Sequence, residues 1–183
     1  MDILAITRPD YFEGEARLIN RLLEQGMKIL HIRKPEPDIS RFRKLMEEIN
    51  PEYYDRIAIH QHHELAADFS LHRLHYTEQQ RRLTPVAKLK EKQEAGFKLS
   101  SSIHELKDLP GLQFLDYVFF GPVFNSISKP GYNSKLPAGF SLPSHLGGPL
   151  VMAVGGVTPE RIVEVSQMNF DGAALLGALW PQK

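Results

Sequence analysis

Eight short apolar runs, mostly separated by segments with helical patterning, constrain this chain more than any other feature of its sequence. Strands that alternate with helices predict a parallel sheet, whose strands are covered on both faces and need no polar alternation. Eight strands favour a closed (β/α)8 TIM barrel over an open flavodoxin-like sheet, in which the first and last strands do not pair. The runs are residues 3–6, 27–32, 56–60, 73–76, 98–101, 117–120, 150–154 and 173–176.

The length of the chain limits how complete this barrel can be. A typical barrel of this class needs about 250 residues, and this chain has 183. We therefore expect one compact domain over residues 1–183, with thin or missing outer helices around strands three to four and five to six, and after strand eight. Without a last helix, apolar barrel wall around Trp180 is expected to be exposed, and a second copy of the chain would cover it in a homodimer.

Capping residues mark several expected helix ends. Gly26 follows one helical stripe, where a glycine cap belongs, and Asp38 precedes another, where an aspartate caps the first turn. Two further pairs have the spacing of a capping box and predict helix starts: Thr77 with Gln80, and Ser102 with Glu105.

Composition excludes several classes of function. Lys plus Arg and Asp plus Glu both number 22, so no net charge favours nucleic acid or an anionic membrane. The absence of cysteine removes disulfides, thiolate nucleophiles and cysteine-based metal sites. The N-terminus does not resemble a signal peptide, and no segment approaches the roughly 20 apolar residues that span a bilayer. We expect a cytoplasmic protein that uses small molecules.

The segment from residue 116 to 131 carries the clearest binding signal. A buried strand over residues 117–120 leads into a loop that contains Ser126, Ser128 and Lys129. Short hydroxyls, exposed backbone N–H groups and an ammonium are the donors that an anion requires, so the loop is a candidate phosphate or pyrophosphate clamp. The alternative is an ordinary surface loop rich in Ser, Asn, Pro and Gly.

Polar residues also collect where other strands are expected to end, and in a barrel these ends share the face that carries the active site. Gly155 and Gly156 precede an expected helix start at Thr158, and predict a second phosphate site because glycine lets backbone N–H groups approach an anion near the helix dipole. A plain strand-to-helix turn is the alternative. The other polar residues at these ends include His31, Arg33, Lys34, His60, Gln61, Tyr76 and Ser102.

These residues resemble those of a known family, the thiamine phosphate synthases and TenI-like barrels. The resemblance covers nearly the whole chain and is carried by residues 5–7, 30–34, 59–66, 74–75, 116–131 and 153–157. Such synthases join hydroxymethylpyrimidine pyrophosphate to a thiazole phosphate, with Mg²⁺ assisting the departure of pyrophosphate. The resemblance implies a phosphate-binding set composed of Arg33 with the adjacent Lys34, Ser102, Ser126, Ser128, Lys129, Gly155 and Gly156.

The sequence departs from the synthase pattern at the metal positions. The two acidic ligands of the family correspond to Gln61 and Gln80, although Mg²⁺ prefers carboxylate oxygens. TenI-like relatives, which isomerise the thiazole by proton transfer, share the His-Ile-Arg of the second strand, but the histidine that they use after strand six corresponds to Pro122. A TenI-like tautomerase and a non-catalytic relative that binds phosphate esters are therefore the alternatives to a synthase.

Histidines supply the candidates for acid–base chemistry. His31 and His60 are the candidate catalytic residues by position, since imidazole titrates near neutral pH. Five of the eight histidines lie between His60 and His75, and His60 and His62 have a spacing along a strand that suits zinc. Because no acidic residue from the other strand ends joins them, polar histidines at the barrel mouth and surface are the favoured interpretation.

Overall fold

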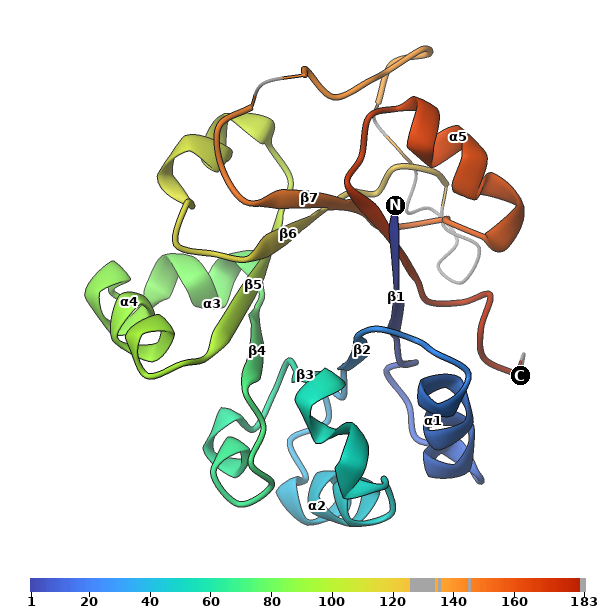
Figure 1. Cartoon of the computed structure of the whole chain (residues 1–183), viewed down its shortest axis with the longest axis vertical. Coiled ribbons are helices and arrows are strands. Elements are labelled where there is room, and N and C mark those ends of the chain that lie inside the picture. The colour runs from blue at the N-terminus through green and yellow to red at the C-terminus, as the bar shows by residue number, and fades with distance from the viewer. Residues whose placement is uncertain (126–133, 135, 145, 182–183) are drawn as a thin grey trace.

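The eight strands close into a parallel barrel (Figure 1). The computed structural model describes residues 1–125, 134, 136–144 and 146–181. Each strand pairs with the next, and β8 pairs with β1 from Asp2↔Gly172 to Ala5↔Leu175. The predicted (β/α)8 barrel is confirmed, and the flavodoxin-like alternative is wrong. The strands are β1 (Asp2–Ile6), β2 (Leu30–Ile32), β3 (Ile57–Ile59), β4 (Arg73–Tyr76), β5 (Lys98–Ile103), β6 (Tyr117–Phe120), β7 (Leu150–Ala153) and β8 (Gly172–Leu175).

The outer layer of helices is thin, as the length of the chain predicted. The 3-10 helix η2 (His63–Ala66) is the helical element between β3 and β4, and η3 (Leu106–Gly111) is that between β5 and β6. Within the described residues no helix follows β8, and none is long and apolar enough to cross a bilayer. The remaining helices are α1 (Glu15–Glu24), α2 (Ile39–Glu47), η1 (Pro51–Arg56), α3 (Glu78–Leu83), α4 (Val86–Glu94), η4 (Pro159–Arg161) and α5 (Ile162–Gln167).

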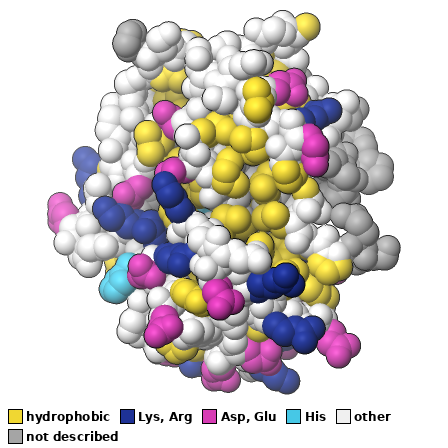
Figure 2. Space-filling model, turned by 45° about the vertical axis from the view of Figure 1, so that its right-hand side comes forward, with side chains coloured by type: hydrophobic (Ala, Val, Ile, Leu, Met, Phe, Trp, Pro, Cys, Tyr) yellow, Lys and Arg dark blue, Asp and Glu magenta, His cyan; other side chains and the backbone are white. Residues whose placement is uncertain are grey.

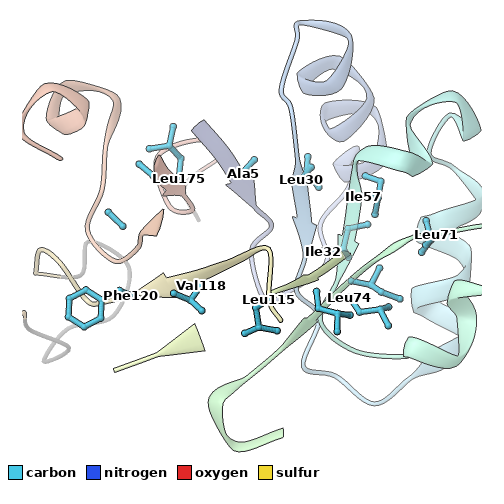
Figure 3. Close-up of a cluster of buried hydrophobic side chains, with 14 of the residues drawn as sticks. Ala5, Leu30, Ile32, Ile57, Leu71, Leu74, Leu115, Val118, Phe120 and Leu175 are labelled. Carbon is cyan, nitrogen blue, oxygen red and sulfur yellow. The ribbon is translucent and has the colours of Figure 1, made fainter. Parts of the chain in front are cut away.

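Alternate residues of each strand serve two separate cores, because successive side chains of a strand point to opposite faces. One set points outward and packs beneath the helices; Figure 3 labels several of its side chains, among them Leu30, Ile57 and Val118. The other set points into the barrel and forms a smaller apolar cluster of Leu4, Ile6, Tyr117, Phe119, Met152 and Ala174. The barrel interior is therefore a packed core with its own composition.

The cap signals were mostly correct. Asp38 accepts hydrogen bonds from the backbone N–H groups of Ser40 and Arg41 at the start of α2, Thr77 and Gln80 form the complete capping box of α3, and Gly26 adopts φ 97° after α1. The capping box expected at Ser102 is wrong. Ser102 lies inside β5, and η3 begins after Glu105 without a side-chain cap.

Trp180 is buried, contrary to the expectation that the missing last helix would expose it. Its side chain is 4% exposed, its indole N–H donates to the Ile6 carbonyl at 2.6 Å, and its ring lies edge-on to Phe12. In Figure 1 the segment after β8 descends between α5 and α1, where an eighth helix would lie, so this segment itself covers the wall.

The same side of the molecule still has an apolar surface. Figure 2 shows hydrophobic side chains gathered across the middle of the face that is reached by turning the right-hand side of Figure 1 forward. That a second copy of the chain packs on this face stays a prediction.

The contribution of Trp180 to barrel closure can be measured by mutation. We expect Trp180→Ala to lower the free energy of unfolding by about 3–5 kcal/mol, because it removes a large buried ring and leaves a cavity. Trp180→Phe should cost about 1–2 kcal/mol, mainly through the lost hydrogen bond to Ile6. Urea denaturation measures both. Leu83→Ala is the control, because Leu83 is 77% exposed; an equal loss in the control and in Trp180→Ala would contradict the proposed cover.

Candidate functional site

Three histidines from neighbouring strands meet inside the barrel. His31 belongs to β2, His60 follows β3 and His75 belongs to β4, and their side chains are 0%, 4% and 1% exposed. Nδ1 of His31 lies 3.0 Å from Nε2 of His60, and the rings of His60 and His75 stack with centroids 4.0 Å apart. The structure thus brings the two candidate catalytic histidines together and adds His75 to them.

Hydroxyl groups surround this histidine cluster, defined here as His31, His60 and His75. The Tyr117 hydroxyl lies 2.7 Å from Nε2 of His31. Ser100 Oγ lies 2.9 Å from Nδ1 of His75, and Ser102 Oγ lies 3.1 Å from Nε2 of the same ring. Both nitrogens of His31 and of His75 therefore have hydrogen-bonding partners inside the barrel.

Burial keeps the histidine cluster neutral. It lowers the pKa of His31 to about 3, and it lowers the pKa values of His60 and His75 well below the ordinary value, with the neighbouring imidazoles adding to the effect. At neutral pH each ring therefore has one N–H group that can donate and one unprotonated nitrogen that can accept a hydrogen bond. In their neutral form these imidazoles can donate or accept a hydrogen bond, but they do not act as preformed imidazolium acids.

His62 does not join His60, so the expected zinc spacing along one strand is wrong. β3 ends at Ile59, and His62 adopts φ 55°, which turns its ring away from the barrel and onto Phe42, with centroids 5.1 Å apart. His63 donates instead to the backbone carbonyls of Ile59 and His75. The favoured interpretation placed these histidines at the barrel mouth and surface; the surface part is wrong for His60 and His75, which are buried.

Lys34 forms a buried ion pair with Glu15. Its Nζ lies 2.6 Å from Glu15 Oε1, with side chains 0% and 2% exposed, and donates further to the carbonyls of Arg8 and Asp10 at 2.9 and 2.8 Å. All three ammonium protons thus have acceptors within the chain, and none is left for a phosphate. Since breaking a buried pair leaves an uncompensated charge, the pair fixes the loop that joins β1 to α1.

Arg33 is the cation that remains available at this end of β2. Its backbone N–H donates to Thr7 Oγ1 at 2.9 Å, which holds the end of β2 against β1. Burial lowers the pKa of its guanidinium, and no carboxylate among the described residues contributes to that shift. A partly desolvated guanidinium without a carboxylate partner is suited to bind an anion.

The two glutamines at the expected metal positions are engaged elsewhere. Gln61 Oε1 accepts the backbone N–H of Lys34 at 2.7 Å. Gln80 Oε1 accepts the backbone N–H of Thr77 at 2.9 Å within the α3 capping box. Neither amide oxygen is directed to a shared cation, and neither side chain carries the negative charge that Mg²⁺ prefers. These residues do not fit the Mg²⁺ site implied by the resemblance.

The Gly155-Gly156 turn lies beside the start of the predicted pyrophosphate loop. The backbone N–H of Phe124 donates to the Gly155 carbonyl at 3.0 Å, and Gly156 adopts φ 65°. A Cβ atom on Gly156 would lie 2.3 Å from the Asn125 carbonyl oxygen, so only glycine fits this close approach. The rest of the predicted clamp, including Ser126, Ser128 and Lys129, lies outside the described residues.

Several residues of this face were not anticipated from the sequence. Tyr117 and Ser100 were not identified as partners of the histidines, and Glu15 was not identified as the partner of Lys34. The alternation of side chains along β5 and β6 could have indicated that Ser100, Ser102 and Tyr117 share the barrel interior. No local pattern links Glu15 to Lys34, because they meet only when the loop after β1 folds over β2.

The fold and the position of these polar residues define a (β/α)8 barrel with its candidate site at the C-terminal ends of the strands, the face that binds ligands in this class. The chain belongs to the thiamine monophosphate synthase family, whose model matches residues 3–179. The resemblance read from the sequence is thereby confirmed at the level of the family.

Individual relatives agree with this family. A thiamine-phosphate synthase from Methylobacillus flagellatus is 38% identical over 65 residues, which is 36% of this chain and 31% of that protein, about a third of its length. The crystal structure of a thiamine phosphate pyrophosphorylase from Bacteroides thetaiotaomicron has a TM-score of 0.71 at 25% identity, covering 98% of this chain and 85% of that one. A thiamine phosphate pyrophosphorylase from Pyrococcus furiosus, at 15% identity and a TM-score of 0.68, covers 96% and 85% and supports the fold alone.

The neutral histidine cluster predicts a loss of stability in weak acid. The folded-state pKa values lie below the unfolded value of about 6.5, so the stabilisation is present above that pH and is lost as pH falls toward the folded values. Three histidines that are protonated only after unfolding should lower the free energy of unfolding by about 4 kcal/mol between about pH 7 and about pH 5.5. Urea denaturation at the two pH values measures the drop.

Variants assign this drop to particular residues. His60→Gln and His75→Gln should each reduce it by about a third. His104→Gln removes an exposed histidine and should leave the drop unchanged. A drop that is the same in all three variants would show that the histidine cluster does not cause it.

Proposed function

We propose that this chain is a thiamine phosphate synthase-like transferase, which joins hydroxymethylpyrimidine pyrophosphate to a thiazole phosphate and releases pyrophosphate. The observation that carries the proposal is the family match over residues 3–179, which includes both predicted phosphate-binding segments. The likeness to a thiamine phosphate pyrophosphorylase at 25% identity supports it. We propose that residues 1–183 act as one domain with small phosphate-containing substrates.

The proposed roles follow from the chemistry of the leaving group. When the thiazole nitrogen attacks the pyrimidine methylene carbon, the bond to pyrophosphate breaks and negative charge develops on the departing oxygen. Cations and hydrogen-bond donors that meet this charge lower the barrier. We assign this role to Arg33 with Ser102, Ser126, Ser128 and Lys129, and we assign the thiazole phosphate to the backbone N–H groups of Gly155 and Gly156.

Lys34 has a supporting role in this proposal, because its ammonium is used by Glu15 and by two backbone carbonyls. Its contacts hold the segment next to Arg33 and so position that guanidinium. No step is assigned to Mg²⁺, since the oxygens of Gln61 and Gln80 have other partners.

A TenI-like tautomerase is the second candidate, and the contact between His31 and His60 favours it. Isomerisation of a thiazole needs one group that removes a proton and one that returns it. Two neutral imidazoles 3.0 Å apart can share these tasks, because a proton accepted by one can pass to the other. In this alternative His31 and His60 are the catalytic residues. A relative that binds phosphate esters without catalysis is the third candidate, favoured by the loss of both metal-binding carboxylates.

A reaction assay distinguishes the three candidates. The purified chain is incubated with hydroxymethylpyrimidine pyrophosphate and the thiazole phosphate, with Mg²⁺ supplied, and the products are separated by chromatography. We expect thiamine phosphate and one equivalent of pyrophosphate. Tautomerised thiazole without thiamine phosphate would reverse the order of the two enzymes, and binding of both esters without any product would favour the non-catalytic relative.

The predicted clamp can be tested separately from turnover. Lys129→Ala should weaken the binding of inorganic pyrophosphate by about 1–3 kcal/mol, as expected for the loss of one charged hydrogen bond. Isothermal titration calorimetry measures the difference. Lys90→Ala, at an exposed lysine of α4, is the matched control and should bind like the wild type. Equal affinities in all three proteins would reduce the loop to an ordinary surface turn.

A further inference from the structure

The histidine cluster brings together more imidazoles than acid–base chemistry requires. Three imidazoles from three successive strands present ligand atoms that all lie within 4.8 Å of one another. The nitrogens of two ligands on a tetrahedral zinc ion are about 3.3 Å apart, given Zn–N bonds of about 2.0–2.1 Å. His31 Nδ1 and His60 Nε2 are already 3.0 Å apart, and no pair in the cluster needs to approach by more than about 1.5 Å to reach that separation.

We infer that His31, His60 and His75 form a binding site for one divalent transition-metal ion, of which Zn²⁺ is the type, inside the mouth of the barrel. The inference goes beyond the proposed transferase activity and does not depend on it, because it concerns the affinity of the protein for the metal alone.

The donor set selects the class of ion. Three neutral imidazoles, with no carboxylate or thiolate among the described members of the cluster, suit Zn²⁺, Co²⁺, Ni²⁺ or Cu²⁺ and are poor ligands for Mg²⁺ and Ca²⁺, which prefer hard oxygen donors. Three protein ligands leave a fourth position open, as in catalytic rather than structural zinc sites.

The hydrogen-bond partners of the histidine cluster, called outer partners here, resemble those around the histidines of established metal sites. A histidine that binds a metal through one nitrogen usually donates its other N–H to an oxygen, which fixes the orientation of the ring. If Nδ1 of His31 faces the ion, its Nε2–H donates to the Tyr117 hydroxyl at 2.7 Å. His75 has Ser100 Oγ on one nitrogen and Ser102 Oγ on the other, so an ion would replace one of these serine contacts and the second serine would remain as the outer partner.

The charge of the surroundings specifies what occupies the fourth position. Neutral ligands leave the full positive charge of the ion in a buried place, and Arg33 is close enough to depress the pKa of His60 electrostatically. An anionic fourth ligand offsets both charges. We therefore expect hydroxide or a phosphate oxygen there.

Cobalt provides a direct test on the full chain. The protein is treated with a chelator, dialysed and titrated with Co²⁺, whose visible d–d absorption intensifies in four- or five-coordinate sites with nitrogen ligands. We expect saturation at one equivalent, displacement by one equivalent of Zn²⁺, and no displacement by a large excess of Mg²⁺. Absence of the absorption in protein that remains folded by circular dichroism would overturn the inference.

Variants locate the ion. His60→Gln and His75→Gln should abolish stoichiometric binding, and Tyr117→Phe should weaken it by about 10- to 100-fold through the lost outer partner. His104→Gln, at an exposed histidine, should bind like the wild type. Binding that survives both of the first two variants would place the metal elsewhere and refute the assignment.

A measurement on the wild-type protein covers the case in which a variant does not fold. The ¹⁵N shifts of the histidine ring nitrogens are recorded before and after addition of one equivalent of Zn²⁺. The rings of His31, His60 and His75 should shift together, while that of His104 stays in place. Unchanged shifts in the cluster would mean that the three imidazoles are only a hydrogen-bonded group.

Discussion

The hydrogen bonding of β8 to β1 is the constraint on which the rest of this structure depends. Once the sheet is closed, every second side chain of each strand must enter a space of fixed width, and that space has to be filled. Leu4, Met152 and Ala174 fill one side of the interior with aliphatic groups. On the other side planar rings fill the interior, and the ring centroid of Phe119 lies 4.8 Å from that of His31 and 5.1 Å from that of His75.

Imidazoles can occupy such an interior only when their nitrogens have partners, because a buried polar atom without one costs about 1–3 kcal/mol. The hydroxyls of Tyr117, Ser100 and Ser102 provide most of these partners. Lys34 and Glu15 solve the same problem at the edge of the barrel, where a buried ammonium is matched by a carboxylate and two carbonyl oxygens. The polar residues of this barrel are thus satisfied mainly by one another, and the cluster and the buried pair are structural units as well as candidate functional ones.

The fold could be predicted from the sequence to a large extent, because strand and helix patterns are local. Eight apolar runs, the cap at Asp38 and the thin outer layer all depend on residues close together in the chain. Contacts between distant segments could not be predicted in this way. His62 follows His60 by two residues, yet β3 has already ended at Ile59, and the left-handed conformation of His62 turns its ring onto Phe42. Trp180 was expected at an open edge, but its indole N–H finds the Ile6 carbonyl, 174 residues away in sequence.

The candidate site also combines local features, which the sequence predicts, with contacts between distant segments, which it does not. Arg33 and Gly156 were identified correctly as residues of strand ends, because position along a strand is a local property. Whether a side chain is free to bind a ligand is not a local property, since it depends on which residues the rest of the fold places beside it. Lys34 is one residue from Arg33, and only the loop after β1 determines that its ammonium is used by Glu15.

For the proposed transfer reaction, charge balance at the mouth of the barrel therefore matters more than the fold does. A departing pyrophosphate carries several negative charges. With Lys34 engaged and amides at positions 61 and 80, Arg33 is the one cation proposed for it among the described residues. Lys129 would add a second positive charge. An ion on the histidine cluster would add two more on the inner side of the same mouth, where the low dielectric strengthens each interaction. A barrel with that charge can stabilise a leaving pyrophosphate, whereas a barrel with Arg33 alone is better suited to hold a phosphate ester that does not react.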